Sequence, residues 1–205
     1  MAKHSKLSVV PQITVRTRRA YFDFKFGQLH VRTAFPTTGG FDEGVTLFCL
    51  HSREGSSRSF ARLLPEIADE RSVYAPDLPG FGESDAAPSA SCAEAAHAVS
   101  DLASDLRLRQ IDVLGVGFGA AVALDLAAAR PELVRRLVLI GTPPLDRIPP
   151  VKQQTLVLRV NADRAEEPWS KGALAHARLA DIGSLALLDA DPKTLAQQVG
   201  AFLKS

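Results

Sequence analysis

The sequence predicts a single α/β domain in which helices cover both faces of a mostly parallel sheet. Short apolar runs alternate with segments of helical spacing over most of the 205 residues, a pattern that favours parallel strands joined by right-handed crossovers. An alternating apolar–polar stretch near the start of the chain adds an antiparallel hairpin. Apolar residues make up 46% of the chain, which is enough for one core. No internal repeat or second domain is visible.

The hairpin is expected in the first part of the chain. Residues 21–26 alternate apolar and polar side chains, as a half-buried strand does. Gly27 and Gln28 then lead into a second extended run at 29–35. The Thr-Thr-Gly-Gly stretch at 37–40 is typical of a loop.

The parallel part of the sheet is expected to begin at residues 45–50. This continuous apolar run fits a strand that is buried on both faces. Apolar side chains at helical spacing predict a helix over 56–70, followed by a short strand at 72–75. A second helix with one apolar face is predicted over 91–108, and a strand over 111–114.

The remaining elements continue the alternation. An alanine-rich helix is predicted over 119–130, where Pro131 ends it. Apolar runs at 137–140 and 156–160 predict two more strands. The last helix is expected to begin at Pro192, because proline is favourable in a first helical turn.

The charge pattern gives no reason to expect a nucleic-acid or membrane partner. The formal net charge is +1, so no overall field would attract either. Residues 1–19 are basic and lack an apolar core of signal-peptide length, so they are interpreted as a mobile arm before a domain over 20–205. No apolar run approaches the roughly 18 residues of a membrane-spanning helix.

The two cysteines, Cys49 and Cys92, are interpreted as reduced structural thiols of a cytoplasmic protein. No Cys/His spacing indicates a metal site, and no cofactor is expected.

Five segments carry a resemblance to a known family. In chain order they are Leu50-His51-Ser52 with Gly55-Ser56-Ser57, residues 77–85, residues 115–121, residues 130–140, and Asp191-Pro192 with the helix that follows. The second, Asp-Leu-Pro-Gly-Phe-Gly-Glu-Ser-Asp, is the most specific. Over about residues 20–203, their order and spacing resemble the α/β-hydrolase fold family. The resemblance implies about eight strands, mostly parallel, after an N-terminal antiparallel hairpin.

The resemblance places Gly117 where the family carries the nucleophilic serine of its G-x-S-x-G turn. Glycine has no side chain, so covalent catalysis at this position is impossible. Phe118, the next residue, would offer its backbone N–H to an oxyanion, and by position Arg53 would offer the second N–H.

The acid and the base of the family also have no clear counterpart. The position that best matches the acid is Arg164, and Asp163 stands one residue earlier. The position of the catalytic histidine matches Leu185. No histidine follows His176, which lies on a segment interpreted as helix-like. Without a base, even a restored serine would remain weakly nucleophilic.

The cap domain of the family is expected to be missing. Only a connector over residues 143–154, with four prolines, occupies its place. We therefore expect a shallow, wet pocket. We also expect an apolar patch at the carboxyl ends of the strands that self-association covers, giving a homo-oligomer.

Several residues admit a second interpretation. Gly115, Gly117 and Ala120 fit a dinucleotide-binding G-x-G-x-x-A, but the motif follows the fifth strand and no acid follows the next strand. His51 could be a base in a rearranged site, whereas the resemblance implies that it supports the oxyanion turn.

Other polar residues are given structural roles. The resemblance implies that Asp77, Ser84 and Asp85 shape their loop. His97 is expected in solvent, and Arg135 and Arg136 are expected to cap a surface junction.

Two main hypotheses for function follow. The first is a pseudoenzyme or small-ligand binding protein with a degenerate triad. Its ligand would lie against His51, Ser52, Arg53, Gly117 and Phe118. The second is an esterase-like hydrolase with non-standard residues, in which water attacks and Asp163 or His51 acts as base. A decayed hydrolase without function is a third hypothesis, which the sequence does not separate from the first.

Overall fold

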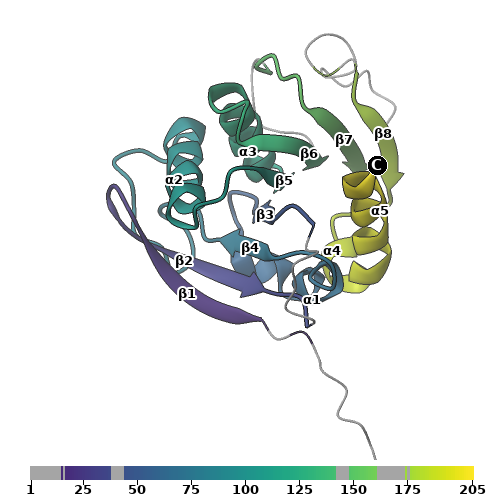
Figure 1. Ribbon diagram of the computed structural model, residues 1–205, viewed down its shortest axis with the longest axis horizontal. Coiled ribbons are helices and arrows are strands. Elements are labelled where there is room, and N and C mark those ends of the chain that lie inside the picture. Colours follow the sequence, from purple (N-terminus) through teal and green to yellow (C-terminus); the bar gives the residue numbers. More distant parts are fainter. Residues whose placement is uncertain (1–14, 16, 38–43, 142–147, 161–173, 175) are drawn as a thin grey trace, which may run out of the picture.

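The computed structural model describes residues 15, 17–37, 44–141, 148–160, 174 and 176–205. Within these residues eight strands form one sheet, in the order β1-β2-β4-β3-β5-β6-β7-β8 (Figure 1). The strands are β1 (Arg18–Phe24), β2 (Gly27–Ala34), β3 (Leu47–Leu50), β4 (Val73–Pro76), β5 (Ile111–Val116), β6 (Val134–Ile140), β7 (Gln154–Val160) and β8 (Arg178–Ile182). The predicted fold class, a mostly parallel sheet after an antiparallel hairpin, is confirmed.

The hairpin sits at one edge of the sheet. β1 pairs antiparallel with β2, and β2 pairs antiparallel with β4, while every pairing from β4 to β8 is parallel. β1 begins at Arg18, a little before the expected strand and inside the segment that the sequence suggested was an arm.

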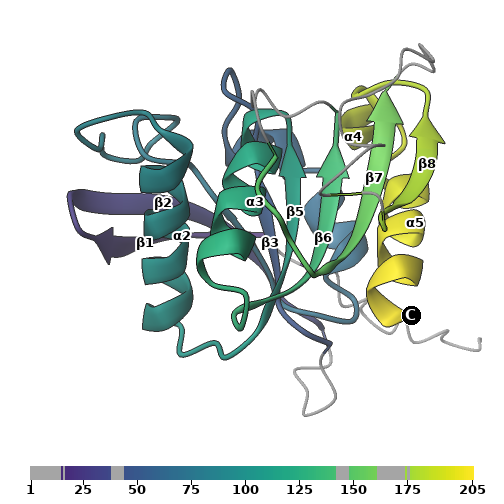
Figure 2. The same ribbon diagram turned by 90° about the horizontal axis from the view of Figure 1, so that it is seen from above.

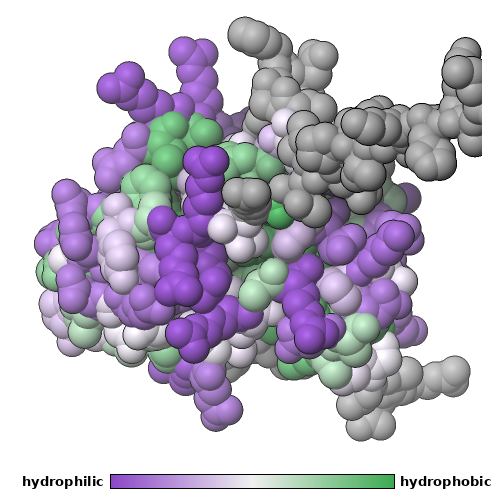
Figure 3. Space-filling model, turned by 90° about the horizontal axis from the view of Figure 1, so that it is seen from below, coloured by the Kyte–Doolittle hydropathy of each residue, from purple (hydrophilic) through white to green (hydrophobic). Residues whose placement is uncertain are grey.

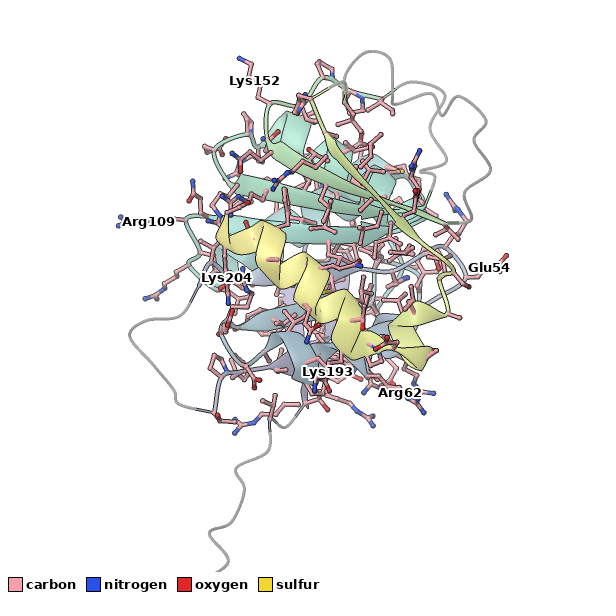
Figure 4. All side chains as sticks on the ribbon, turned by 90° about the vertical axis from the view of Figure 1, so that its right-hand side faces the viewer. Glu54, Arg62, Arg109, Lys152, Lys193 and Lys204 are labelled. Atoms are coloured by element: carbon pink, nitrogen blue, oxygen red, sulfur yellow. The ribbon has the colours of Figure 1, made fainter. Side chains whose placement is uncertain are left out.

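Helices cover both faces of the sheet (Figures 1 and 2). The helical segments are η1 (Ser57–Phe60), α1 (Leu63–Ile67), α2 (Cys92–Asp105), α3 (Phe118–Ala129), α4 (Leu187–Ala190) and α5 (Pro192–Lys204). The buried apolar residues of α2 and α3 belong to one core, and those of α1 and α5 belong to a second core on the opposite face. Figure 4 shows α5 lying across its face of the sheet, with Lys193 and Lys204 at its two ends. No helix in the described ranges has both the length and the apolar character needed to span a membrane.

The helix predicted over residues 56–70 is instead a short 3₁₀ turn followed by the five-residue α1. Pro65 explains the break. A continuous helix would need the N–H that proline lacks, and its ring would clash with the carbonyl of Ala61, four residues earlier. Starting a new helix at Leu63 places Pro65 in the first turn, where the missing N–H costs little.

Arg135 and Arg136 do not cap a surface junction, as the sequence suggested, but lie in β6. Arg135 donates from Nε and Nη2 to the fully buried Asp112 carboxylate, at 2.9 Å and 2.6 Å. Arg71 Nη1 donates to the same carboxylate at 3.1 Å. Arg136 donates to the carbonyls of the last turn of α5. The two arginines therefore tie the end of α5 and a buried acid to the middle of the sheet.

Large apolar side chains that remain exposed in the described residues fall in two regions. Three lie on or beside the hairpin and two lie at β8: Tyr21, Phe26, Phe35, Leu179 and Leu185. On the face shown in Figure 3, hydrophilic side chains separate the apolar areas of the coloured surface.

Candidate functional site

The candidate site lies where the strand order reverses. β3 and β5 are neighbours in the centre of the sheet, yet the chain continues from β3 toward one edge and from β5 toward the other. In open α/β sheets the loops at such a point leave a crevice at the carboxyl ends of the strands, where ligands bind. Leu50 pairs with Gly115, so the turn after β3 meets the turn that joins β5 to α3.

Gly117 forms the turn between β5 and α3 and has φ +51° and ψ −108°. Its N–H donates to the carbonyl of Ile140 at 3.0 Å. Its own carbonyl accepts from the N–H groups of Ala120, at 3.0 Å, and Ala121, at 3.2 Å. Residues with a side chain rarely adopt this backbone conformation, and glycine adopts it readily. The turn between β5 and α3 is therefore sharp at Gly117, the position matched from the sequence to the nucleophile, and it carries no side chain there.

The flanking glycines serve packing. A Cβ on Gly119 would overlap the carbonyl oxygen of Leu50, and a Cβ on Gly115 would overlap the start of α3 at Gly119 and Ala120. Position 117 differs, because the nearest atom of the described residues to a Cβ there would be Ser52 Cβ, at an ordinary contact distance of 3.7 Å. The described residues thus leave space for a side chain at Gly117 and none at Gly115 or Gly119.

Two backbone N–H groups are available beside this turn. Phe118 is the first residue of α3, so its N–H has no acceptor within the helix. Within the described ranges, neither this N–H nor that of Arg53 donates to another group. The positive end of the α3 dipole adds to the attraction for a negatively charged or polarised oxygen.

A row of ring contacts flanks the turn. The Arg53 guanidinium lies over the Phe118 ring, 4.3 Å from its centroid. The Phe118 ring contacts Phe81 at a centroid distance of 6.0 Å, and Phe81 contacts the His51 ring at 5.5 Å. These contacts fix the Arg53 side chain beside the turn, although it is exposed to solvent.

His51 is fully buried and supports the turn with both ring nitrogens. Nε2 accepts from the N–H of Leu78 at 2.9 Å, so the proton lies on Nδ1, which donates to the carbonyl of Ser52 at 2.7 Å. Burial lowers the pKa of His51 below its usual value, despite the opposing effect of the hydrogen bond to Ser52. No ring nitrogen is left free to take a proton from a ligand or a water.

Asp77, which the resemblance assigned to the shape of its loop, accepts three hydrogen bonds. They come from the N–H of Ser57 at 2.6 Å, the N–H of Glu83 at 2.8 Å and Nδ1 of His30 at 2.9 Å. Burial opposes ionisation of this carboxyl, but the hydrogen bonds outweigh it and hold the pKa of Asp77 below its usual value. Asp77 is therefore ionised, and its three hydrogen bonds hold the loop in place.

Ser84 and Asp85 also hold this loop. Ser84 Oγ donates to the carbonyl of Asp77 at 2.7 Å, and the Asp85 carboxylate accepts from the N–H of Gln28 at 2.8 Å. Sequence reasoning did not single out His30, the buried partner of Asp77. His30 stands between the apolar Leu29 and Val31 of β2, but Arg32 and Thr33 follow in the same strand, so no distinct signal in the sequence indicated a buried histidine.

Leu185, matched from the sequence to the position of the family base, is 41% exposed in the turn between β8 and α4. Ser184 precedes it in the same turn. Asp163 and Arg164, at the predicted acid position, lie outside the described residues.

His176 lies before the start of β8, whereas Gly117 follows the end of β5, so the two residues lie at opposite ends of the parallel strands. Most of the segment that was interpreted as helix-like lies outside the described residues, and His176 itself stands in a turn two residues before β8. Its Nε2 donates to the carbonyl of Gln153 at 3.1 Å. It lines a cavity of about 470 Å³ together with Lys152. In Figure 4, Lys152 lies on the side opposite Glu54, which follows β3. His176 is therefore not placed to act on a ligand at Gly117.

The remaining candidate groups give no reactive centre. Burial raises the pKa of the Cys49 thiol and, together with the nearby Asp125 carboxyl, that of Cys92, so both thiols stay protonated. His97 is exposed on α2. Across the described part of the chain, no cluster of three His, Cys, Asp or Glu side chains is arranged to hold a metal ion.

Comparison with known proteins identifies the family. A family model described as the alpha/beta hydrolase fold matches residues 45–170. The chain belongs to this family. The match covers both turns of the candidate site and the loop of Asp77.

Curated relatives align with about half of this chain. A 2-hydroxymuconate semialdehyde hydrolase from Pseudomonas sp. (strain CF600) is 36% identical over 118 residues, which are 55% of this chain and 40% of the relative. Pyrrolizixenacetamide deacetylase from Xenorhabdus hominickii is 34% identical over 101 residues, which are 48% of this chain and 38% of that protein. The chain therefore spans less than half the length of these relatives.

Solved structures resemble almost the whole chain. A CIB-like hydrolase from Thermoplasma acidophilum superposes with a TM-score of 0.77 at 15% identity, covering 93% of this chain and 99% of that one. Juvenile hormone epoxide hydrolase from the silkworm Bombyx mori superposes with a TM-score of 0.72 at 18% identity, covering 86% of this chain and 74% of that one. At these identities the likeness concerns the fold.

Proposed function

We propose that this member of the alpha/beta hydrolase family binds a small ligand through a carbonyl or carboxylate oxygen and does not hydrolyse it by a serine mechanism. The observation that carries the proposal is Gly117, which keeps the turn of the nucleophile without a side chain. The turn still presents two N–H donors, so an oxygen ligand can be held there, but no atom can form an acyl intermediate.

Two further residues, His51 and Leu185, support binding over hydrolysis. His51, the histidine beside the turn, uses both ring nitrogens within the protein fold. Leu185 occupies the position that matches the family base. In serine hydrolases the nucleophile and base act as a unit, so the absence of both removes most of the rate that the triad supplies.

A second candidate function is hydrolysis by other residues, and two observations favour it. The two N–H donors remain beside the turn, and Ser52 Cβ lies 3.7 Å from the place of a Cβ at Gly117. Its hydroxyl is therefore the serine to test as an alternative nucleophile. Two of the aligned relatives are named as a hydrolase and a deacetylase, which is compatible with this alternative.

One experiment separates the two candidates. The purified protein and its Ser52→Ala variant are treated with a fluorophosphonate probe and assayed with p-nitrophenyl acetate. We expect neither labelling nor turnover above buffer. In parallel, backbone amide resonances are followed while small carbonyl compounds and carboxylic acids are added, and we expect the N–H resonances of Phe118 and Arg53 to shift. Stoichiometric labelling that Ser52→Ala abolishes would refute the proposal and establish the second candidate.

A further inference from the structure

We infer that Arg53 makes this site selective for organic anions, so that the ligand is a small carboxylate and not a neutral ester, amide or ketone. This inference rests on the proposed function, because it concerns the ligand of the same turn. The inference assigns a role in binding to the side chain of Arg53, in addition to the backbone N–H groups at the turn.

Arg53 brings two groups to the site. Its backbone carries one N–H of the donor pair, and its guanidinium carbon lies over the Phe118 ring, 4.3 Å from the ring centroid. The backbone of Phe118 carries the other N–H, and Phe118 is 3% exposed, so the ring beneath the guanidinium is fixed. The five N–H groups of a guanidinium lie in one plane, and two of them can bind a carboxylate together.

The charge of Arg53 has no acidic partner within 4.0 Å among the described residues. Several other arginines do have one: Arg58 with Glu83, Arg71 and Arg135 with Asp112, Arg130 with Glu132, and Arg159 with Asp181. Glu54 is the nearest acid in sequence, and its side chain points away from the molecule in Figure 4. A positive charge held beside two free N–H donors and a helix N-terminus favours an anion over a neutral oxygen.

The glycine at 117 provides the space for this anion. Among the described residues, a Cβ there would have no neighbour closer than 3.7 Å, so they leave open the volume that a nucleophile side chain would fill. One carboxylate oxygen could accept from the two backbone N–H groups, and the second could accept from the Arg53 guanidinium. An ester or an amide offers the first oxygen but no charge to the guanidinium.

The test uses three probes of one shape: phenylacetate, phenylacetamide and methyl phenylacetate. Each is titrated into the full chain while the amide resonances of Phe118 and Arg53 are followed. Because charge-assisted hydrogen bonds are about twice as strong as neutral ones, we expect phenylacetate to bind about tenfold more tightly than the two neutral probes.

Three variants test whether the charge of Arg53 causes the preference for phenylacetate. Arg53→Met removes the charge and keeps an unbranched side chain, so we expect it to abolish the tenfold preference. Arg53→Lys keeps the charge and should retain part of the preference. Arg58→Met is the matched control, because Arg58 is also exposed and its guanidinium is already within 3.7 Å of Glu83, and it should leave the preference intact.

The outcomes distinguish the inference from the proposed function. If all three probes bind equally at Phe118, or if Arg53→Met keeps the preference, the inference is overturned and the proposed function stands. If Arg58→Met reduces the preference as much as Arg53→Met, the attraction is a general surface effect and the inference is again overturned. If none of the probes shifts the Phe118 or Arg53 resonance, the proposed function fails and the inference fails with it.

Discussion

The substitution Gly117→Ser tests the turn directly, because it restores the hydroxyl that the family carries. The described residues give no clash, since the nearest of their atoms to the new Cβ is Ser52 Cβ at 3.7 Å. It does predict backbone strain, because φ is +51° and ψ is −108°. A residue with a side chain in such a sparsely populated region costs on the order of 1–3 kcal/mol. For a domain of this size, that loss lowers Tm by roughly 2–10 °C.

We expect no efficient esterase from this single change. The new hydroxyl would stand beside the N–H groups of Phe118 and Arg53, yet Leu185 stands at the position predicted for the base. His51 cannot replace the base without giving up its bonds to Leu78 and Ser52. The expected rate is therefore at most the weak residual rate that oxyanion stabilisation alone supplies.

The assays are thermal unfolding and hydrolysis of p-nitrophenyl acetate, with the parent protein as baseline. Gly117→Ala is the matched control, because it carries the same backbone strain without a hydroxyl. Gly117→Ser combined with Leu185→His, with Asp163 or an aspartate at position 164 as acid, is the smallest set expected to turn over. Esterase-like rates from Gly117→Ser alone would refute the reasoning about the base. An unchanged Tm in both single variants would refute the prediction that a side chain at position 117 strains the backbone.

Three further predictions concern stability. Gly119→Ala should destabilise the fold by more than Gly117→Ala in urea unfolding, because its Cβ meets the carbonyl of Leu50; equal losses would contradict the packing argument. Asp112→Asn should cost about 3–5 kcal/mol, since it leaves two arginines without their buried partner, and a loss below about 1 kcal/mol would show that the cluster is not a stabilising one. Burial lowers the pKa of His51, so the unfolded chain takes up a proton first and stability should fall as pH drops below about 6.5. His51→Asn should reduce this dependence of stability on pH. An unchanged dependence would show that groups other than His51 cause it.

The elements that the sequence predicted well are those with a strong apolar pattern. The predicted runs at 111–114, 137–140 and 156–160 are mainly apolar, and they fall within β5, β6 and β7. The last helix, α5, begins at Pro192 as expected. β8 was not located from its pattern, because Arg178–Ile182 lies at the edge of the sheet and most of its side chains are exposed. A strand whose pairing partner supplies its stability carries little apolar signal of its own.

Buried charges were the other feature that local patterns did not show. Asp112 stands inside an apolar strand, and its arginine partners are 41 and 23 residues away in sequence. Such an acid is tolerated only because those distant cations reach it. Arg135 and Arg136 were placed at the surface for the same reason, since a charge is normally exposed unless a partner is known. Pairing of this kind depends on the tertiary fold, so the sequence alone does not reveal it.

The motif around the candidate site contains two kinds of glycine, and they carry different information. Gly115 and Gly119 have no room for a side chain, so the packing of α3 against β5 and against the end of β3 requires them whatever the protein does. Their presence therefore indicates the fold and says nothing about catalysis. Gly117 has room, and in a hydrolase the reactive hydroxyl justifies the strain of a side chain there. A glycine at this position removes that strain once no hydroxyl is needed, while the N–H of Phe118 and the side chain of Arg53 keep their places. The function of this site should thus be sought in what these two residues bind.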